Sequence, residues 1–322
     1  MESEWTILLP TRPQPDTIVA IFLLKTFGTT RFLGIEHVRV EVNPNAPNES
    51  FEVLTTKRIL PIDVGGGPFD HHGTSYCASE LVAGLLKISD NPALAKMLAY
   101  AKRDDAFGKG TVSSDPLDRA FGLSGLIASL NKQFPGQAQK IVETVLPLLA
   151  AHYDASHKHL IELPAAIEEK KRTGEYTETQ VTQGDKRLKV SFVVSDEPGM
   201  VTYLRSFQGP RSDVVVQKSE KGNRICIVTR QERKVQLAAV AALIRMREAE
   251  LRGITLPENS AYWSQDGKIA ELHMWYVDPA TNSVLNVGTA TDDTLISWDE
   301  IQRLVSRGLA IELKKKTETL AS

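Results

Sequence analysis

The feature that most constrains the fold of this chain is a set of three short apolar segments in its first 64 residues. Residues 5–9, 37–41 and 58–64 carry apolar side chains in a run or in alternation, and turn-forming residues follow each of them. Between the first two segments, a broad apolar face starts near Asp16 and predicts a helix. Strands that alternate with helices are typical of a largely parallel sheet with helical cover, so we expect an α/β fold.

The length of the chain predicts two domains, because 322 residues exceed the usual size of one compact core. Residues 77–153 have apolar side chains at helical spacing, whereas residues 173–186 are polar and show no apolar period. We therefore predict an N-terminal parallel-sheet domain over residues 1–175, a linker over residues 176–186 and a smaller α/β domain over residues 187–322.

Charge and cysteine content exclude several classes of protein. The formal net charge of −2 gives no bulk attraction to nucleic acid or membranes, so a polyanion would need a local basic groove. No apolar stretch approaches the roughly 20 residues that cross a bilayer. Cys77 and Cys226 lie far apart and form no metal-binding spacing. We expect buried thiols in a cytoplasmic protein that does not bind membranes.

Acidic and imidazole side chains recur where an open α/β sheet places its ligands, beyond the carboxyl ends of the strands. Asp16 follows the first predicted strand and Asp63 ends the third, just before the run Asp70-His71-His72. Asp104 and Asp105 lie at the end of a predicted helix. Carboxylates with imidazoles suit Mn²⁺, or Mg²⁺ in its place. One bridging carboxylate can hold two such ions about 3.5–4 Å apart, so we expect one or two ions.

Each of these pieces also has a purely structural interpretation. Asp16 alone is typical of a helix cap, and Asp104-Asp105 of a solvated pair. Gly65-Gly66-Gly67 alone is a turn, and it lacks the Lys-Ser/Thr of a P-loop. The order and spacing of the pieces along the chain favour the functional interpretation. Adjacent buried histidines also favour it, because they need polar partners.

The run Asp70-His71-His72, preceded by Asp63-Val64-Gly65-Gly66, resembles the signature of the DHH phosphoesterase superfamily, which includes RecJ-like exonucleases. Residues 213–216, 225–230 and 235–242 resemble the DHH-associated substrate domain of that superfamily. The resemblance implies a DHH-type domain followed by a DHH-associated-like domain. It also implies a metal-dependent phosphodiesterase that acts on short single-stranded nucleic acid or small nucleotides in an interdomain cleft.

The resemblance implies a role for each matched position of the triplet. Asp63 would bridge two Mn²⁺ ions and His71 would be a direct ligand. Asp70 would contact His71 and orient it toward the ions. His72 would contact the phosphate or the leaving oxygen.

Further positions complete the implied site. Asp16 would be the ligand of the first motif, and either Asp105 or Asp104 the last ligand. Arg230 would touch the substrate from the second domain. Four basic side chains are expected to line one side of the substrate cleft: Lys102, Arg103, Lys109 and Arg119. The alternative interpretation of each is an ordinary solvent-exposed charge on a helix.

The first motif departs from the pattern of the family. Arg12 and Ile18 stand where the family has metal ligands, and neither side chain binds Mn²⁺. The Arg12 guanidinium would instead replace one ion and hold a phosphate. After Arg230 the family's Gly-Gly-Gly-His is missing. The alternative function is therefore a degenerate member that binds a nucleotide or a partner without catalysis. The sequence is compatible with a homodimer and does not decide the oligomeric state.

Overall fold

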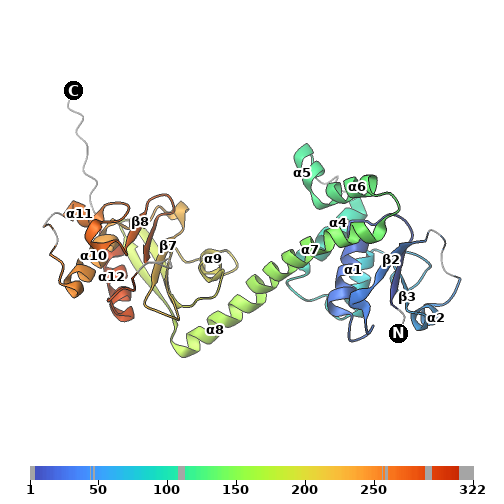
Figure 1. Cartoon of the computed structure of the whole chain (residues 1–322), viewed down its shortest axis with the longest axis horizontal. Coiled ribbons are helices and arrows are strands. Elements are labelled where there is room, and N and C mark those ends of the chain that lie inside the picture. The colour runs from blue at the N-terminus through green and yellow to red at the C-terminus, as the bar shows by residue number, and fades with distance from the viewer. Residues whose placement is uncertain are drawn as a thin grey trace, which may run out of the picture. The chain divides into compact units, whose positions relative to one another are not determined.

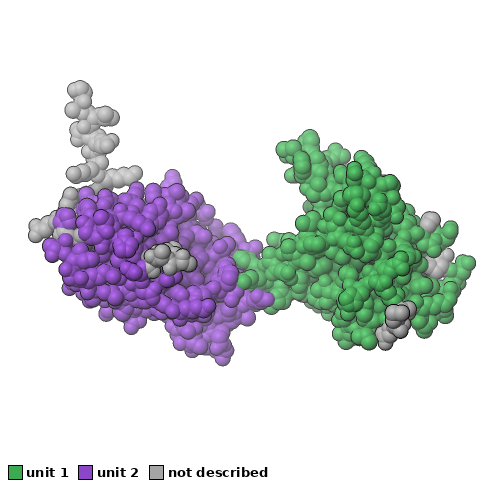
Figure 2. All heavy atoms as spheres, in the orientation of Figure 1, with its two compact units in different colours: residues 1–161 green, residues 162–322 purple. Residues whose placement is uncertain are grey.

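The computed structural model describes residues 4–43, 45, 48–107, 113–255, 257, 260–286 and 292–311. The chain divides into two compact units, Met1–Ile161 and Glu162–Ser322 (Figures 1 and 2). The first unit is shorter than the predicted N-terminal domain, because residues 162–175 belong to the second unit.

A small parallel sheet forms the centre of the first unit, as the sequence predicted. Its strands are β1 (Thr6–Leu9), β2 (Arg39–Val42) and β3 (Ile59–Pro61), in the order β2-β1-β3. Thr6 lies beside Arg39 on one side and beside Ile59 on the other, both in parallel register. The third strand is shorter than predicted, because the chain turns away after Ile62.

Helices cover this sheet, and the most central of them is α1 (Pro15–Phe27). Residues 15–24 of α1 are all buried, and the helix packs against four other α-helices of this unit and against the short turn Ile35–His37. The remaining helices of the first unit are α2 (Phe51–Thr56), α3 (Ala78–Leu85), α4 (Ala95–Phe107), α5 (Pro116–Phe121), α6 (Leu123–Gln133) and α7 (Ala138–His157). The helices α5 and α6 are separated at Gly122, whose backbone is extended.

The second unit is built on a mixed sheet of six strands in the order β4-β5-β6-β7-β9-β8. Only β5 and β6 pair in parallel, and the other neighbours are antiparallel. The strands are β4 (Tyr176–Gln183), β5 (Lys186–Val194), β6 (Val214–Lys218), β7 (Ile225–Thr229), β8 (Tyr276–Asp278) and β9 (Ser283–Asn286).

The α-helices in the described part of this unit are α8 (Leu163–Thr173), α9 (Met200–Arg205), α10 (Ala238–Arg252), α11 (Ser260–Ser264) and α12 (Trp298–Ala310). The helices α10 and α12 pack against each other, and their apolar side chains join those of the sheet in one core.

The predicted linker over residues 176–186 is wrong. These residues form β4 and the turn that leads into β5, and Tyr176 to Gln183 pair along the whole of β5. Only Tyr176, Val181 and Gln183 of β4 are buried, because the strand lies at the edge of the sheet. Edge strands commonly carry polar and charged side chains, and such a strand therefore shows no clear apolar period.

None of the helices that the structure describes is long and apolar enough to span a membrane.

Candidate metal centre

The candidate site lies at the carboxyl ends of β1 and β3, which are neighbouring parallel strands. After β1 the chain enters α1, whose first turn contains Asp16. After β3 it reaches Asp63, whose backbone has φ +60°, a left-handed conformation that aspartate tolerates better than most residues. The Asp63 N–H donates to the carbonyl of Phe69 at 3.0 Å and closes the loop between them.

Two glycines give the loop between Asp63 and Asp70 its tight shape. Gly65 and Gly66 adopt φ values of +83° and +64°, which a side chain would oppose. The Gly66 N–H donates to Oδ2 of Asp70 at 2.7 Å. The tight loop therefore brings Asp70 and the two histidines back to the strand end.

The centre of the site is the Oδ1 atom of Asp63. It lies 2.8 Å from Nε2 of His71 and 3.6 Å from Nδ1 of His72, and the two imidazole rings stack with centroids 5.3 Å apart. On its other side, Nδ1 of His71 lies 3.6 Å from Oδ2 of Asp105. Two carboxylates and two imidazoles from three separate segments thus meet at one point.

Asp70 contacts His72 rather than His71, which differs from the role that the family resemblance implies. Oδ1 of Asp70 accepts a hydrogen bond from the His72 backbone N–H at 3.1 Å and lies 2.6 Å from Nδ1 of the same residue. Because its other oxygen accepts the Gly66 N–H, the carboxylate fixes both the loop and the His72 ring.

Asp16 is nearly buried, at 4% exposure, and holds the N-terminus of α3. Its two oxygens accept hydrogen bonds from the backbone N–H groups of Ala78 at 3.0 Å and Ser79 at 2.9 Å. It does not cap its own helix, whose N-cap is Gln14. One ligand atom each of Asp16, His71 and Asp105 nevertheless lies within 4.8 Å of the others.

These residues fit a divalent cation. Asp63, Asp70 and His72 form a second group whose ligand atoms lie within 4.8 Å of one another. The Asp63 Oδ1 atom is buried and has no hydrogen-bond partner, although two imidazole nitrogens face it. A buried carboxylate oxygen requires a partner, and mixed carboxylate and imidazole donors suit Mn²⁺.

Burial and hydrogen bonds shift the pKa values in this cluster in opposite directions. Burial raises the pKa of Asp63 and of Asp105 above the usual aspartate value, although the neighbouring histidines oppose this shift. Burial also acts to raise the pKa of Asp70, but hydrogen bonds from His72 and Gly66 together lower it. The hydrogen bond to Asp70 raises the pKa of His72 and favours its charged form.

Asp104, the alternative last ligand, does not join this cluster. It is 6% exposed and lines a cavity of about 910 Å³ together with Tyr100, Arg103 and Arg119. Asp105 is therefore the member of the pair that lies in the candidate centre. Arg103 packs its guanidinium over the Tyr100 ring at 5.5 Å. Lys109 lies outside the described residues.

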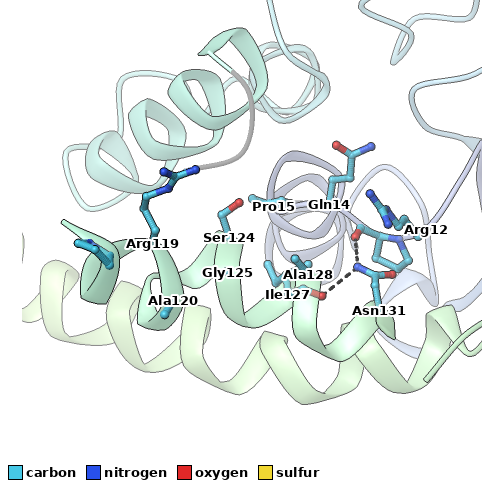
Figure 3. A pocket seen from close by; sticks show the side chains of 12 residues that line it. Arg12, Gln14, Pro15, Arg119, Ala120, Ser124, Gly125, Ile127, Ala128 and Asn131 are labelled. Atoms are coloured by element: carbon cyan, nitrogen blue, oxygen red, sulfur yellow. Dashed lines mark hydrogen bonds between the residues drawn. The ribbon is translucent and has the colours of Figure 1, made fainter. Parts of the chain in front are cut away.

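Arg12 lines a second cavity, of about 490 Å³, between the start of α1 and the helices α5 and α6 (Figure 3). Within the described part of the chain, no ion pair or hydrogen bond joins its guanidinium to the candidate centre. The side chain of Ile18, the other departure from the family motif, is fully buried in the core.

Arg230 belongs to the second unit and has acidic partners there. Its guanidinium lies 3.3 Å from Asp213 and 3.3 Å from Glu232, and Arg233 shares the Asp213 carboxylate at 3.0 Å.

A scan of protein-family models and a search of curated proteins found no match to this chain.

Some residues that shape the site were not found from the sequence. The Asn131 amide donates to the carbonyl of Pro13 at 2.8 Å and anchors the loop between β1 and α1 (Figure 3). The Tyr100 hydroxyl accepts the Ser124 N–H at 2.9 Å and ties α4 to α6. Neither contact has a signal in the sequence, because each joins residues from distant segments through one polar atom.

Proposed function

We propose that the first unit is a metal-dependent phosphoesterase that cleaves phosphodiester bonds in short single-stranded nucleic acid or in small nucleotides. The observation that carries the proposal is the position of Asp63 Oδ1. This buried oxygen has no hydrogen-bond partner, and ring nitrogens of both His71 and His72 lie close to it. Such a carboxylate is suited to bridge cations that act on a phosphoryl group.

The ion would be held by two sets of side chains. Asp16, His71 and Asp105 form one set, and Asp63 belongs to the other with His72 nearby. When bound, Mn²⁺ or Mg²⁺ supplies Lewis-acid polarisation of the phosphoryl oxygens and activates water for attack.

His72 has the properties of the group that meets the substrate. Its side chain is 72% exposed, whereas that of His71 is 16% exposed. Because Asp70 raises the pKa of His72, the charged ring can hold a phosphate oxygen or donate a proton to the leaving oxygen. Asp70 keeps the ring in place through two contacts.

The resemblance of the sequence to the DHH phosphoesterases supports the same proposal. The order strand, Asp63, glycine loop and Asp70-His71-His72 agrees with the parallel sheet and the switch point between β1 and β3. We propose that the first unit is a DHH-type domain and the second a DHH-associated-like domain.

The proposal is tested by the release of nucleotides from a short single-stranded oligonucleotide with Mn²⁺. We expect His72→Ala to slow release by about 10²-fold, the usual contribution of a proton donor. His71→Ala and Asp63→Asn remove ligand atoms and should abolish release. His37→Ala is the matched control, because His37 is exposed and precedes β2, at the opposite end of the parallel sheet from the candidate centre. Equal release by wild type and His71→Ala contradicts the proposal.

One observation favours a second candidate function, binding without catalysis. The two positions that depart from the family motif are occupied by a core side chain, Ile18, and by Arg12 in a separate cavity. The motif thus offers fewer ligands than the family pattern. For a binder, nucleotide would raise the free energy of unfolding, and this rise would follow the logarithm of the ratio of nucleotide concentration to Kd. A binder would show no turnover with any divalent ion.

A further inference from the structure

Outside the candidate centre, two adjoining cavities lie around the helices α4, α5 and α6. The cavity of about 490 Å³ and that of about 910 Å³ share Arg119, Ser124 and Gly125 in their walls. Pro15 lines the smaller and Asp104 the larger, and each immediately precedes a residue of the candidate centre, Asp16 or Asp105. The two cavities are thus lined by residues directly next in sequence to two residues of the centre, and their size suits a nucleotide.

Asp104 is the first observation that points to a ligand. The residue is 6% exposed, and its Oδ1 atom accepts no hydrogen bond from the residues that the structure describes. An ionised carboxylate only accepts hydrogen bonds, and burying one without a donor costs free energy. A ligand with N–H donors in the larger cavity would supply what the protein does not.

The two arginines of the smaller cavity are the second observation. Neither Arg12 nor Arg119 forms an ion pair with any residue in the described ranges. Figure 3 shows them on opposite sides of the pocket, with Ile127 and Ala128 between them. Guanidinium groups that have no carboxylate partner bind phosphate oxygens well.

Apolar side chains at the rim of the larger cavity are the third observation. Leu117 and Phe121 line it, and they are 67% and 73% exposed. An exposed aromatic ring next to arginines is typical of surfaces on which a nucleobase stacks, and here Phe121 supplies the ring.

We infer that this pair of cavities binds a guanine nucleotide. Arg119, which lines both cavities, holds a phosphate other than the scissile one, Phe121 and Leu117 cover the base, and Asp104 accepts hydrogen bonds from it. The inference rests on the proposed function, because it specifies the substrate of the same site.

The choice of guanine follows from the donors that each base offers. Guanine presents its ring N1–H and its exocyclic amino group side by side, and a carboxylate can accept from both. Adenine and cytosine place an acceptor nitrogen beside their amino group, which would face the carboxylate unfavourably. Uracil has one ring N–H between two carbonyl oxygens. Asp104 therefore discriminates for guanine and against the other three bases.

The inference is tested by calorimetric binding of GMP and AMP to the full chain in the presence of EDTA. We expect wild type to bind GMP about tenfold or more tighter than AMP, the scale of a good bidentate base contact. Asp104→Asn should remove this preference, whereas Arg119→Ala should weaken both nucleotides. Asp154→Asn, an exposed carboxylate on α7, is the control that should keep the preference.

A probe on the ligand side avoids dependence on the folding of the Asp104 variant. The monophosphate of 1-methylguanosine lacks the N1–H, and wild type should bind it about tenfold more weakly than GMP. Equal affinities of wild type for GMP, AMP and the methylated nucleotide overturn the inference. Equal weakening of GMP and AMP by Asp104→Asn also overturns it, because that result assigns Asp104 to the ribose.

The binding experiment separates this inference from the proposed function. Guanine-selective binding without any release of nucleotides from an oligonucleotide supports the guanine-binding inference and contradicts the proposed phosphoesterase activity. Metal-dependent release without any preference between GMP and AMP supports the proposed phosphoesterase activity and contradicts the guanine-binding inference.

Discussion

The Oδ1 atom of Asp63 lies 2.8 Å from Nε2 of His71, across a glycine-rich loop that separates the two residues in the sequence. The contact depends on the left-handed backbone of Asp63 and on the hydrogen bond from its N–H to Phe69. It places a carboxylate and an imidazole close enough to share one ion, which is why we propose that the candidate centre binds a cation.

Asp63→Asn should stabilise the metal-free protein. Burial raises the pKa of Asp63 above its usual 3.8, so the folded state binds the proton more tightly than the unfolded state. The ionised carboxylate therefore lowers stability above the raised pKa, and this penalty disappears as the pH falls through that pKa toward 3.8. Asparagine has a similar shape and tolerates the same φ.

The effect is measured by calorimetric melting in EDTA. We expect the Tm of Asp63→Asn at neutral pH to exceed that of wild type by roughly 1–4 °C, and the difference to shrink near about pH 4. A variant that melts below wild type at neutral pH would show that the carboxylate is satisfied within the fold.

Asp16→Ala should destabilise the first unit whether or not a metal binds. Its carboxylate accepts two backbone N–H groups at the start of α3, and alanine leaves both without a partner. We expect a loss of about 1–3 kcal/mol in the free energy of unfolding, measured by urea denaturation. Asp90→Ala, an exposed residue of the same unit, should change little. Equal effects of the two variants would refute the anchoring role.

Both cysteines should be unreactive in the native protein. Burial raises the pKa of Cys77 to about 12 and that of Cys226 to about 11, so neither forms appreciable thiolate near neutral pH. Titration with a thiol reagent should detect both groups only after denaturant is added. Rapid modification of the native chain would contradict this account of the two thiols.

Arg245→Met should destabilise the second unit strongly. The buried guanidinium donates to four backbone carbonyls, those of Trp263, Gln265, Gly267 and Trp275. Methionine leaves these acceptors unsatisfied, so we expect a loss of about 3 kcal/mol or more. Arg247→Met removes only partly exposed ion pairs and should change the stability little. Hydrogen exchange would locate both losses in the second unit.

The parallel sheet and the convergence of Asp63 with His71 could be predicted from the sequence. Apolar runs with glycine or proline after them mark strands that end at one edge, and ligands gather at that edge in open α/β sheets. The short loop from Asp63 to His71 leaves few ways to separate the two side chains.

Other features could not be predicted, because they depend on contacts between distant segments. The polar edge strand β4 looked like a linker, since pairing with β5 rather than an apolar period specifies it. The sequence also left Asp104 and Asp105 equivalent. On the helix α4, neighbouring residues point in different directions, so only Asp105 reaches His71 while Asp104 faces the adjoining cavity.

The central claim is that the side chains around Asp63 bind a divalent cation, and paramagnetic resonance titration with Mn²⁺ tests it most directly. Wild type should bind one or two ions, and His71→Ala and Asp63→Asn should each weaken binding by at least about tenfold. His37→Ala should bind as wild type does. Undiminished Mn²⁺ binding by both His71→Ala and Asp63→Asn would contradict the account.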